Sequence, residues 1–296
     1  MPTFEEKINE YREEIDNYLN SKLPSGDIPP KNLHQAMNYS VMNGGKRIRP
    51  LLTFASAESL KVDPKKLIPA AAAIEFLHCF SLVHDDLPCM DDDDLRRGHP
   101  STHKVYGEAA AILAADALLS LSFEILATDY SFGGTSSINT SLISLISSAT
   151  GSSGITGGQQ LDLNAEENII EQSEVEHIYR QKTGKLLRAC ILAPTCFIEI
   201  SLEKKTALER YVDALGLAFQ IKDDVLEAEG SSQIIGKSSK SDIKKQKASF
   251  PIIFGLDISK KRIHELLDLA QNEISIFGDN AQPLKYMAES IINRTF

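Results

Sequence analysis

Apolar residues at intervals of three or four recur along almost the whole chain of 296 residues. Near the N-terminus Phe4, Ile8, Tyr11, Ile15 and Leu19 follow this spacing, which places them on one face of an amphipathic helix. The same spacing, interrupted by Gly, Pro, Ser or Asn, predicts further helices over 32–43, 67–86, 107–128, 139–149, 174–196, 204–229 and 260–274. No run alternates apolar and polar residues as a half-buried strand would. The predicted fold class is therefore all-α.

Two stretches rich in serine and glycine, 131–141 and 147–158, could be read as linkers. Only about ten residues of helical pattern separate them, so we interpret both as loops within one domain that covers residues 1–296. The basic stretch 230–249 is compatible either with a solvated loop or with a lid that closes over an anion.

The formal net charge of −10 argues against binding to a nucleic-acid backbone, for which basic surfaces are needed. An anionic substrate would instead need local positive charge or a metal. The cysteines Cys79, Cys89, Cys190 and Cys196 have no zinc-ligand spacing and suggest no disulfide framework, so we expect a reducing, cytoplasmic location.

Two segments were considered as targeting or membrane sequences. The N-terminal segment carries charges throughout and lacks the apolar centre of a secretory signal. The apolar run LIPAAAAIEFLHCFSLV contains Pro69, Glu75 and His78, so we expect no stable insertion into a membrane.

The stretch HDDLPCMDDDDLRRG concentrates carboxylates that would repel one another without a cation nearby. Asp85 and Asp86 are expected to end a helix, because Pro88 cannot continue it, and the following turn can bring Asp91 back beside them. Clustered carboxylates of this kind suit Mg²⁺. A solvated acidic loop is the alternative. The largely apolar segment FSLVH that precedes the aspartates disfavours it, because such a segment is expected to be buried.

Two other ion-binding motifs each fail at two positions. An EF-hand loop starting at Asp91 would have Arg96 in place of its glycine and Thr102 in place of its final acid. GGKRIRP is not a P-loop, because Ser40 stands where the first glycine is needed and Arg47 replaces the Ser or Thr.

A second acidic group lies in LGLAFQIKDDVLEAEG, where Gln220, Asp223 and Glu227 share one helical face, with Asp224 beside them. Two such groups suggest that they face each other across a cavity and share metal ions. Separate basic clusters would then form a pocket for phosphorylated substrates. These clusters are Lys46, Arg47 and Arg49; Arg96 and Arg97; Lys182 and Lys185; and Lys237 and Lys247.

The motifs GGKRIRP, EFLHCFSLVHDDLPCMDDDDLRRG, GGQQLDL, KTGKL and FQIKDDVLE occur in this order. Together they resemble the trans-isoprenyl diphosphate synthases, in particular the bacterial farnesyl diphosphate synthases (geranyltranstransferases). The resemblance implies a single-domain helical bundle around a central active-site cavity, usually homodimeric. It also implies a Mg²⁺-dependent prenyltransferase that condenses isopentenyl diphosphate with dimethylallyl or geranyl diphosphate to farnesyl diphosphate. A geranylgeranyl diphosphate synthase and a class I terpene cyclase are the alternatives.

Specific roles also follow from the resemblance. It implies three Mg²⁺ ions held by Asp85, Asp86, Asp91 and Asp223, which with Lys182 and Gln220 form the expected catalytic set. The expected ligands of the allylic diphosphate are Arg96, Lys182, Thr183, Gln220, Lys237 and Lys247. Those of isopentenyl diphosphate are Lys46, Arg49, His78 and Arg97. Gln160 resembles the family's glutamine near the reacting carbons.

Two features bear on variation within this family. The second acidic motif of the family commonly reads QDDxxD, whereas this chain has Lys222 at its first position and Glu227 at its last, which leaves direct metal ligation by Glu227 open. Phe80 and Ser81 stand five and four residues before Asp85. The resemblance implies that an aromatic residue at that point stops chain growth, which favours a farnesyl over a geranylgeranyl product.

Overall fold

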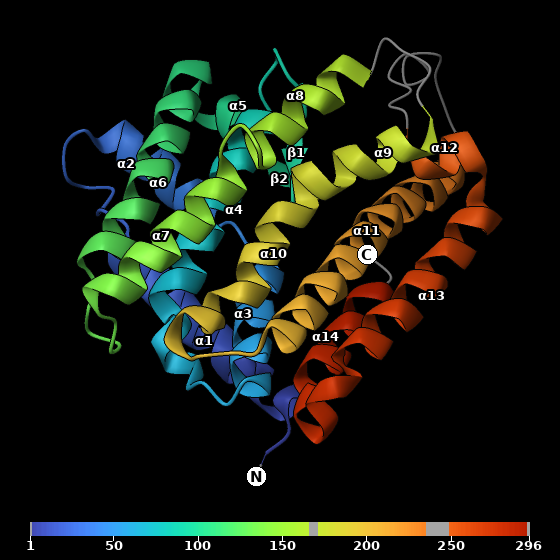
Figure 1. Ribbon diagram of the computed structural model, residues 1–296. Coiled ribbons are helices and arrows are strands. Elements are labelled where there is room, and N and C mark those ends of the chain that lie inside the picture. The colour runs from blue at the N-terminus through green and yellow to red at the C-terminus, as the bar shows by residue number, and fades with distance from the viewer. Residues whose placement is uncertain (1, 166–170, 235–248, 295–296) are drawn as a thin grey trace. The chain divides into compact units, whose positions relative to one another are not determined.

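The computed structural model describes residues 2–165, 171–234 and 249–294 (Figure 1). Helices dominate this part of the chain and the only strands in it form one two-residue pair, so the all-α prediction is confirmed. The chain divides into two compact units. The first consists of Met1–Ser147 and Ala193–Glu199, and the second of Ser148–Leu192 and Ile200–Phe296. That these form a single domain stays a prediction.

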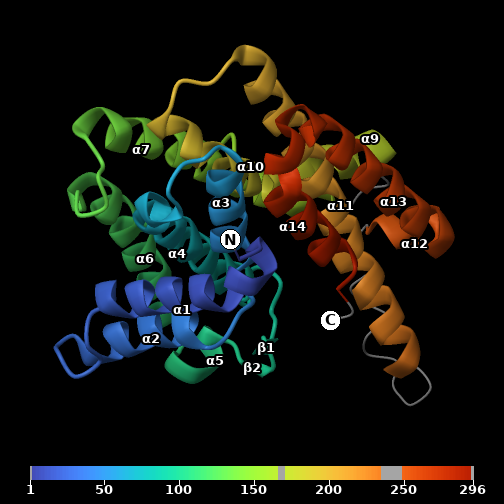
Figure 2. The ribbon, with the colours of Figure 1, turned by 90° about the horizontal axis from the view of Figure 1, so that it is seen from below.

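The first unit is a layered set of helices with one short hairpin. It contains α1 (Phe4–Lys22), α2 (Lys31–Met42), α3 (Ile48–Ser59), η1 (Pro64–Leu67), α4 (Ile68–Asp85), β1 (Leu95–Arg96), β2 (His99–Pro100), α5 (Thr102–Tyr106), α6 (Glu108–Thr128), most of α7 (Ser136–Thr150) and η3 (Ala193–Phe197). Figure 2 shows α1 lying beside α2.

The start of α1 illustrates how sequence dictates structure here. Thr3 and Glu6 form a capping box, in which each side chain bonds the backbone N–H of the other residue. The predicted apolar stripe from Phe4 to Leu19 is buried in full, which confirms the helical interpretation of this segment.

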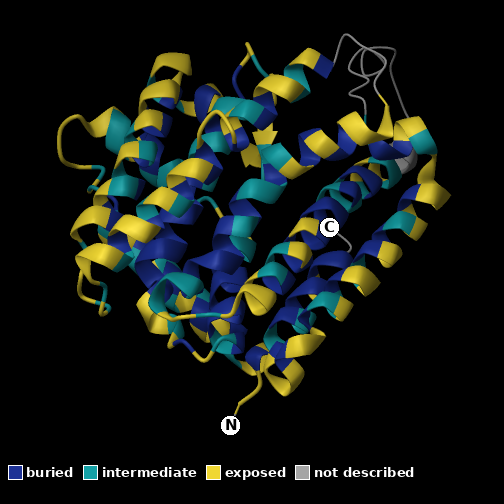
Figure 3. Ribbon diagram, in the orientation of Figure 1, coloured by how far each residue is buried: buried dark blue, intermediate teal, exposed yellow. Residues whose placement is uncertain are grey.

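Two helical stretches of the described chain, Pro64–Asp85 and Glu108–Thr128, are long and apolar enough to cross a membrane by length and composition. The apolar composition of the first has another explanation, because 72% of its apolar window is buried inside the fold. It forms the core of the first unit, where α4 packs against α6. The window in α6 is 39% buried, and Figure 3 shows buried and exposed positions side by side on this helix.

The second unit is built around the longest helix, α11 (Leu202–Ile234), which packs against α13 (Leu256–Glu273) and α14 (Gln282–Ile292). The Tyr211 hydroxyl is fully buried there and donates to the carbonyl oxygen of Leu284 at 2.8 Å. The remaining elements are α8 (Ile155–Ala165), α9 (Gln172–Tyr179), η2 (Arg180–Gly184), α10 (Lys185–Leu192), α12 (Phe250–Phe254) and η5 (Ile274–Ala281).

Two predicted elements are wrong in this unit. The segment 174–196 is not one helix, because the π-helical turn η2 interrupts it and the 3₁₀ turn η3 ends it. The segment 147–158 is not one loop, because α8 already begins at Ile155. Gly157 and Gly158 are helical, and Gly158 lies against η2, where an added Cβ would sit 2.2 Å from the backbone nitrogen of Lys182.

Other differences concern segments without a strong helical pattern. The spacing does not predict helices α3, α5, α8, α12 and α14. The prediction of a loop over 131–141 is wrong beyond residue 135, because α7 begins at Ser136, and α11 extends to Ile234, five residues past its predicted end. Most of the basic stretch 230–249, including Lys237 and Lys247, lies outside the described residues.

Candidate active site

The first aspartate motif forms the predicted turn. Asp85 is the last residue of α4, and its carbonyl oxygen accepts a hydrogen bond of 2.8 Å from the backbone N–H of Asp91. The N–H of Met90 bonds back to the carbonyl of Leu87 at 2.9 Å, which closes the turn that contains Pro88. The expectation that Asp91 returns beside Asp85 is thus confirmed.

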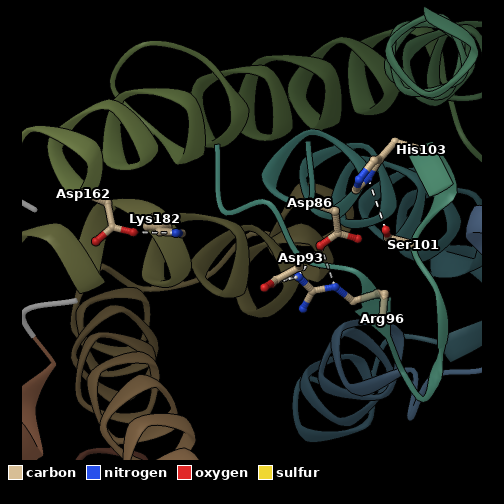
Figure 4. A network of polar contacts seen from close by, with 7 residues as sticks. All are labelled: Asp86, Asp93, Arg96, Ser101, His103, Asp162 and Lys182. Carbon is tan, nitrogen blue, oxygen red and sulfur yellow. Dashed lines mark hydrogen bonds and ion pairs between the residues drawn. The ribbon is translucent and has the colours of Figure 1, made fainter. Parts of the chain in front are cut away.

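Asp86 differs from its neighbour because it is buried, with 2% of its surface exposed. Its Oδ1 accepts hydrogen bonds from two nitrogens of Arg96, at 2.9 Å from Nε and at short range from Nη2, which also donates to Asp93 at 3.1 Å (Figure 4). Burial raises the pKa of Asp86, and the Arg96 guanidinium offsets only part of this effect. Asp94 pairs with Lys104 at 2.7 Å, so two of the three acids after Asp91 have cationic partners.

A cationic cluster surrounds His78, seven residues before Asp85 on the same helix. Burial and the positive charges of Arg49, Arg97, Arg96 and Arg47, in that order of effect, hold the pKa of His78 well below its usual value. The imidazole is therefore neutral at pH 7 among guanidinium groups, and the excess positive charge suits an anionic ligand.

Arg97 is seated on the glycine pair of GGKRIRP. Its Nη1 donates to the carbonyl oxygen of Gly44, and an added Cβ on Gly45 would lie 2.9 Å from the Arg97 guanidinium. The glycine at position 45 thus permits the close approach of the guanidinium. Lys46 follows directly and is exposed.

In the second unit, η2 presents two of the predicted substrate ligands. Lys182 pairs with Asp162 at 2.6 Å (Figure 4), and the Thr183 hydroxyl donates to Oε1 of Gln220 at 2.8 Å. Gln220 Nε2 in turn donates to Asp224 at 3.2 Å. Thr183 and Gln220, distant in sequence, are thus brought together as one polar chain. Single π-helical turns of this kind occur frequently at functional sites.

The two adjacent aspartates of the second motif point to different partners. Asp224 is buried, and its Oδ2 accepts from the Tyr179 hydroxyl and from the backbone N–H of Phe250. Burial raises the pKa of Asp224 to about 6 despite these hydrogen bonds. Asp223 is half-buried and pairs with Arg294, whereas Glu227 is exposed. Only Asp223 and Glu227 are thus placed to meet solvent or a ligand.

Three polar residues of these sites are not singled out by the sequence motifs: Gln159, Asp162 and Arg294. Gln160 is exposed and donates to Asn164, whereas Gln159 is buried and neither of its amide atoms has a hydrogen-bond partner among the described residues. The role expected for Gln160 stays a prediction, and nothing in the local sequence distinguishes Gln159, which follows the closely packed Gly158. Asp162 is three residues further along the same motif, and nothing in the local sequence marks Arg294.

The chain resembles known proteins over its whole length. A family model described as polyprenyl synthetase matches residues 30–280. The chain belongs to the polyprenyl synthetase family. It is 38% identical to the farnesyl diphosphate synthase of Geobacillus stearothermophilus, over 98% of this chain and 97% of that one. It is also 38% identical to the geranylgeranyl diphosphate synthase of Cyanophora paradoxa, over 97% and 95% of the two chains.

A solved structure of a polyprenyl synthetase relative supports the fold. The apo crystal structure of an FPP/GFPP synthase from Zymomonas mobilis matches with a TM-score of 0.87 at 33% identity, covering 98% of both chains. The predicted isoprenoid-synthase class of fold is therefore confirmed.

The residues expected to hold magnesium fit that ion in their chemistry. Carboxylate oxygens are the donors that Mg²⁺ prefers, together with water and phosphate oxygens. Within the described residues no three acids, histidines or cysteines lie close enough to hold an ion by themselves. The acids here would thus share the ion with other ligands, and phosphate oxygens of a substrate are of the right kind.

Proposed function

We propose that this chain is a Mg²⁺-dependent prenyltransferase that condenses isopentenyl diphosphate with dimethylallyl or geranyl diphosphate to (2E,6E)-farnesyl diphosphate, releasing diphosphate. The observation that carries this proposal lies within the first unit. Asp85 ends α4, and the arginine-surrounded His78 lies seven residues earlier, about 10 Å along the helix axis. A cation site next to an anion site suits two diphosphate substrates. Relatives named farnesyl diphosphate synthase over nearly the full chain support the same activity.

The roles of the residues follow from their charges. Asp85, Asp86, Asp91 and Asp223 would hold Mg²⁺, which when bound neutralises the departing diphosphate. Arg96, Lys182, Thr183, Gln220 and, outside the described residues, Lys237 and Lys247 would bind the allylic diphosphate. Lys46, Arg49, His78 and Arg97 would bind isopentenyl diphosphate.

The reaction needs no nucleophile from the protein. The double bond of isopentenyl diphosphate attacks the allylic carbon as the C–O bond to diphosphate breaks, and the proton then lost passes to the released diphosphate. The protein would bind, orient and stabilise the separated charges, which is the largest catalytic contribution in many enzymes. Gln159, whose buried amide faces no partner in the described chain, would contact the reacting region.

Phe80 supports a C15 rather than a C20 product. Its ring is half-buried, lies edge-on to His84 with ring centroids 4.9 Å apart, and packs against an apolar cluster below the aspartate motif. A second candidate, geranylgeranyl diphosphate synthesis, is favoured by the similarity to the Cyanophora paradoxa enzyme. A class I terpene cyclase is less well supported, because a cyclase uses one diphosphate substrate and leaves the His78 cluster without a role.

Further proposals concern the setting of the enzyme. We propose a homodimer located in the cytoplasm, with no nucleic acid partner and no stable membrane insertion. The net charge of −10 and the burial of the apolar α4 support the last two points.

The test is product analysis with purified protein, both C5 substrates and Mg²⁺. The expected product is farnesyl diphosphate, detected as a C15 alcohol after phosphatase treatment, with no product in EDTA. A C20 alcohol would replace the farnesyl proposal by the geranylgeranyl one. A hydrocarbon formed from an allylic diphosphate alone would favour a cyclase.

A further inference from the structure

Arg47, in the middle of GGKRIRP, is one of the charges near His78, but its guanidinium is held by acceptors of the protein itself. Its side chain is 3% exposed, and each of its three nitrogens donates to a different acceptor. Nε bonds Oδ1 of Asp16 at 2.7 Å, Nη1 bonds Oε1 of Glu75 at 2.9 Å and Nη2 bonds the Val41 carbonyl at 2.9 Å. All three nitrogens are thus bonded to protein acceptors in a buried position, and the guanidinium links the loop to α1, α2 and α4.

Glu75 is the matching feature on α4. It is 2% exposed and lies in the otherwise apolar first half of this helix, one turn before His78. A buried ion pair gains little net stability, because both charges lose their hydration. Hydrophobic residues would fill the same space without that loss, so orientation is the property that the pair adds.

The loop conformation shows what must be oriented. Gly44, Gly45 and Arg47 all have positive φ values, of 84°, 125° and 51°. Arg47 is a non-glycine residue in the left-handed region, a conformation that persists only where the surroundings hold it. It directly precedes α3, so the same contacts fix the first turn of that helix, which carries Arg49.

We propose that the buried Arg47–Glu75 ion pair is a positioning device for the anion-binding cluster of the first unit. The pair holds the GGKRIRP loop on α4, so that Lys46, Arg49 and the Gly44 carbonyl that seats Arg97 are in register with His78. Arg47 and Glu75 are positioning residues, since neither touches a substrate. The proposal rests on the proposed function, and it names which substrate depends on the pair: isopentenyl diphosphate.

The test replaces both charges together. Arg47→Met with Glu75→Leu keeps the buried volume similar and removes both buried charges. The Asp16 carboxylate that loses Arg47 is 44% exposed to water, so the fold should persist. We expect the KM for isopentenyl diphosphate to rise about 10- to 100-fold, because misplaced binding groups lose affinity steeply with distance. The KM for geranyl diphosphate should change little. Hydrogen exchange of the backbone amides of residues 43–50, measured without substrate, should become faster.

Two further variants complete the design. Arg188→Met with Asp213→Leu removes a partly exposed ion pair of the second unit, together with the contact of Arg188 to Glu209, and should leave both KM values and the exchange of residues 43–50 unchanged. Arg47→Lys keeps the charge but cannot reach three acceptors, and it should raise the KM for isopentenyl diphosphate by a smaller factor. This variant decides the question if the double variant does not fold.

The outcomes separate this proposal from the proposed function. An unchanged KM for isopentenyl diphosphate in a folded variant would overturn the positioning role, as would equal increases of both KM values. If the unaltered protein does not condense the two substrates, the proposed function fails. Unchanged hydrogen exchange of residues 43–50 in the double variant would then still refute the positioning role of the Arg47–Glu75 pair.

Discussion

The hydroxyl of Tyr179 donates a short hydrogen bond to Oδ2 of Asp224, the residue that follows the proposed metal ligand Asp223. The same carboxylate receives Nε2 of Gln220 on its other oxygen. A buried carboxylate thus connects α9 to the side chain expected to bind the allylic diphosphate. In this motif Asp223 is the proposed metal ligand, and we propose that Asp224 orients its neighbours.

Replacing Tyr179 by Phe removes one donor from this buried carboxylate. We expect the free energy of unfolding to fall by about 1–3 kcal/mol. The KM for geranyl diphosphate should also rise, because Asp224, the partner of Gln220, loses one of the hydrogen bonds that fix it. The matched control is Tyr18→Phe, which removes a similar hydrogen bond to Asp129 in the first unit. Denaturant unfolding and steady-state kinetics give the comparison, and equal KM values in the two variants would refute the orienting role of Asp224.

The pairing of Arg294 with Asp223 predicts an effect on magnesium. A cation bonded to a metal ligand competes with the ion, so Arg294→Ala should lower the Mg²⁺ concentration for half-maximal activity. The pair is partly exposed, with 43% of the Asp223 side chain accessible, and solvent screening limits the gain to about twofold to fivefold.

Calorimetric titration of Mg²⁺ in the presence of inorganic diphosphate provides a readout that is independent of turnover. Arg188→Ala, which removes a cation from Asp213, is the control and should leave the titration unchanged. A higher Mg²⁺ requirement in Arg294→Ala would mean that Arg294 supports the site instead of competing for it.

Much of the local structure could be predicted from the sequence. The stripe from Phe4 to Leu19 predicted α1, because apolar residues spaced three or four apart lie on one face of a helix and are buried together. Pro88 predicted the turn that returns Asp91, because a proline cannot continue a helix. In both cases the cause lies within a few residues of the effect.

Features set by distant partners could not be predicted in the same way. Gly157 and Gly158, a pair that usually marks a loop, lie in α8, and Gly158 packs against η2, more than 20 residues away in the sequence. Asp223 and Asp224 have different partners, Arg294 for Asp223 and Tyr179 for Asp224, and both partners are distant in the sequence. Local spacing placed both aspartates near one helical face and could not tell which would be buried.

The low pKa of His78 predicts a pH dependence of stability. Below pH 6.5 the unfolded chain binds a proton on this histidine that the folded chain does not bind. The free energy of unfolding should therefore decrease as the pH falls below 6.5, by at most about 1.4 kcal/mol per pH unit from this group.

Urea unfolding at pH 7.5 and pH 5.5 measures this dependence. His78→Gln should lose less stability between the two values than the unaltered protein, and a variant of the exposed His264 controls for removing an imidazole elsewhere. The same loss of stability in His78→Gln would show that His78 does not stay neutral in the folded chain.

Phe80 predicts a change of product length. Its ring packs against a cluster of four buried residues, Val83, Leu87, Ala111 and Ala115. Two of these are alanines of α6, so removing the ring leaves space beside short side chains. Phe80→Ala should therefore admit a longer chain and shift the products from C15 toward C20, at a cost of about 2 kcal/mol in stability.

Phe132→Ala, which removes a ring that contacts Tyr18 in the same unit, should leave the product unchanged. Mass spectrometry of the dephosphorylated products separates the two variants, and a C15 product from Phe80→Ala would assign the limit on chain growth to another residue.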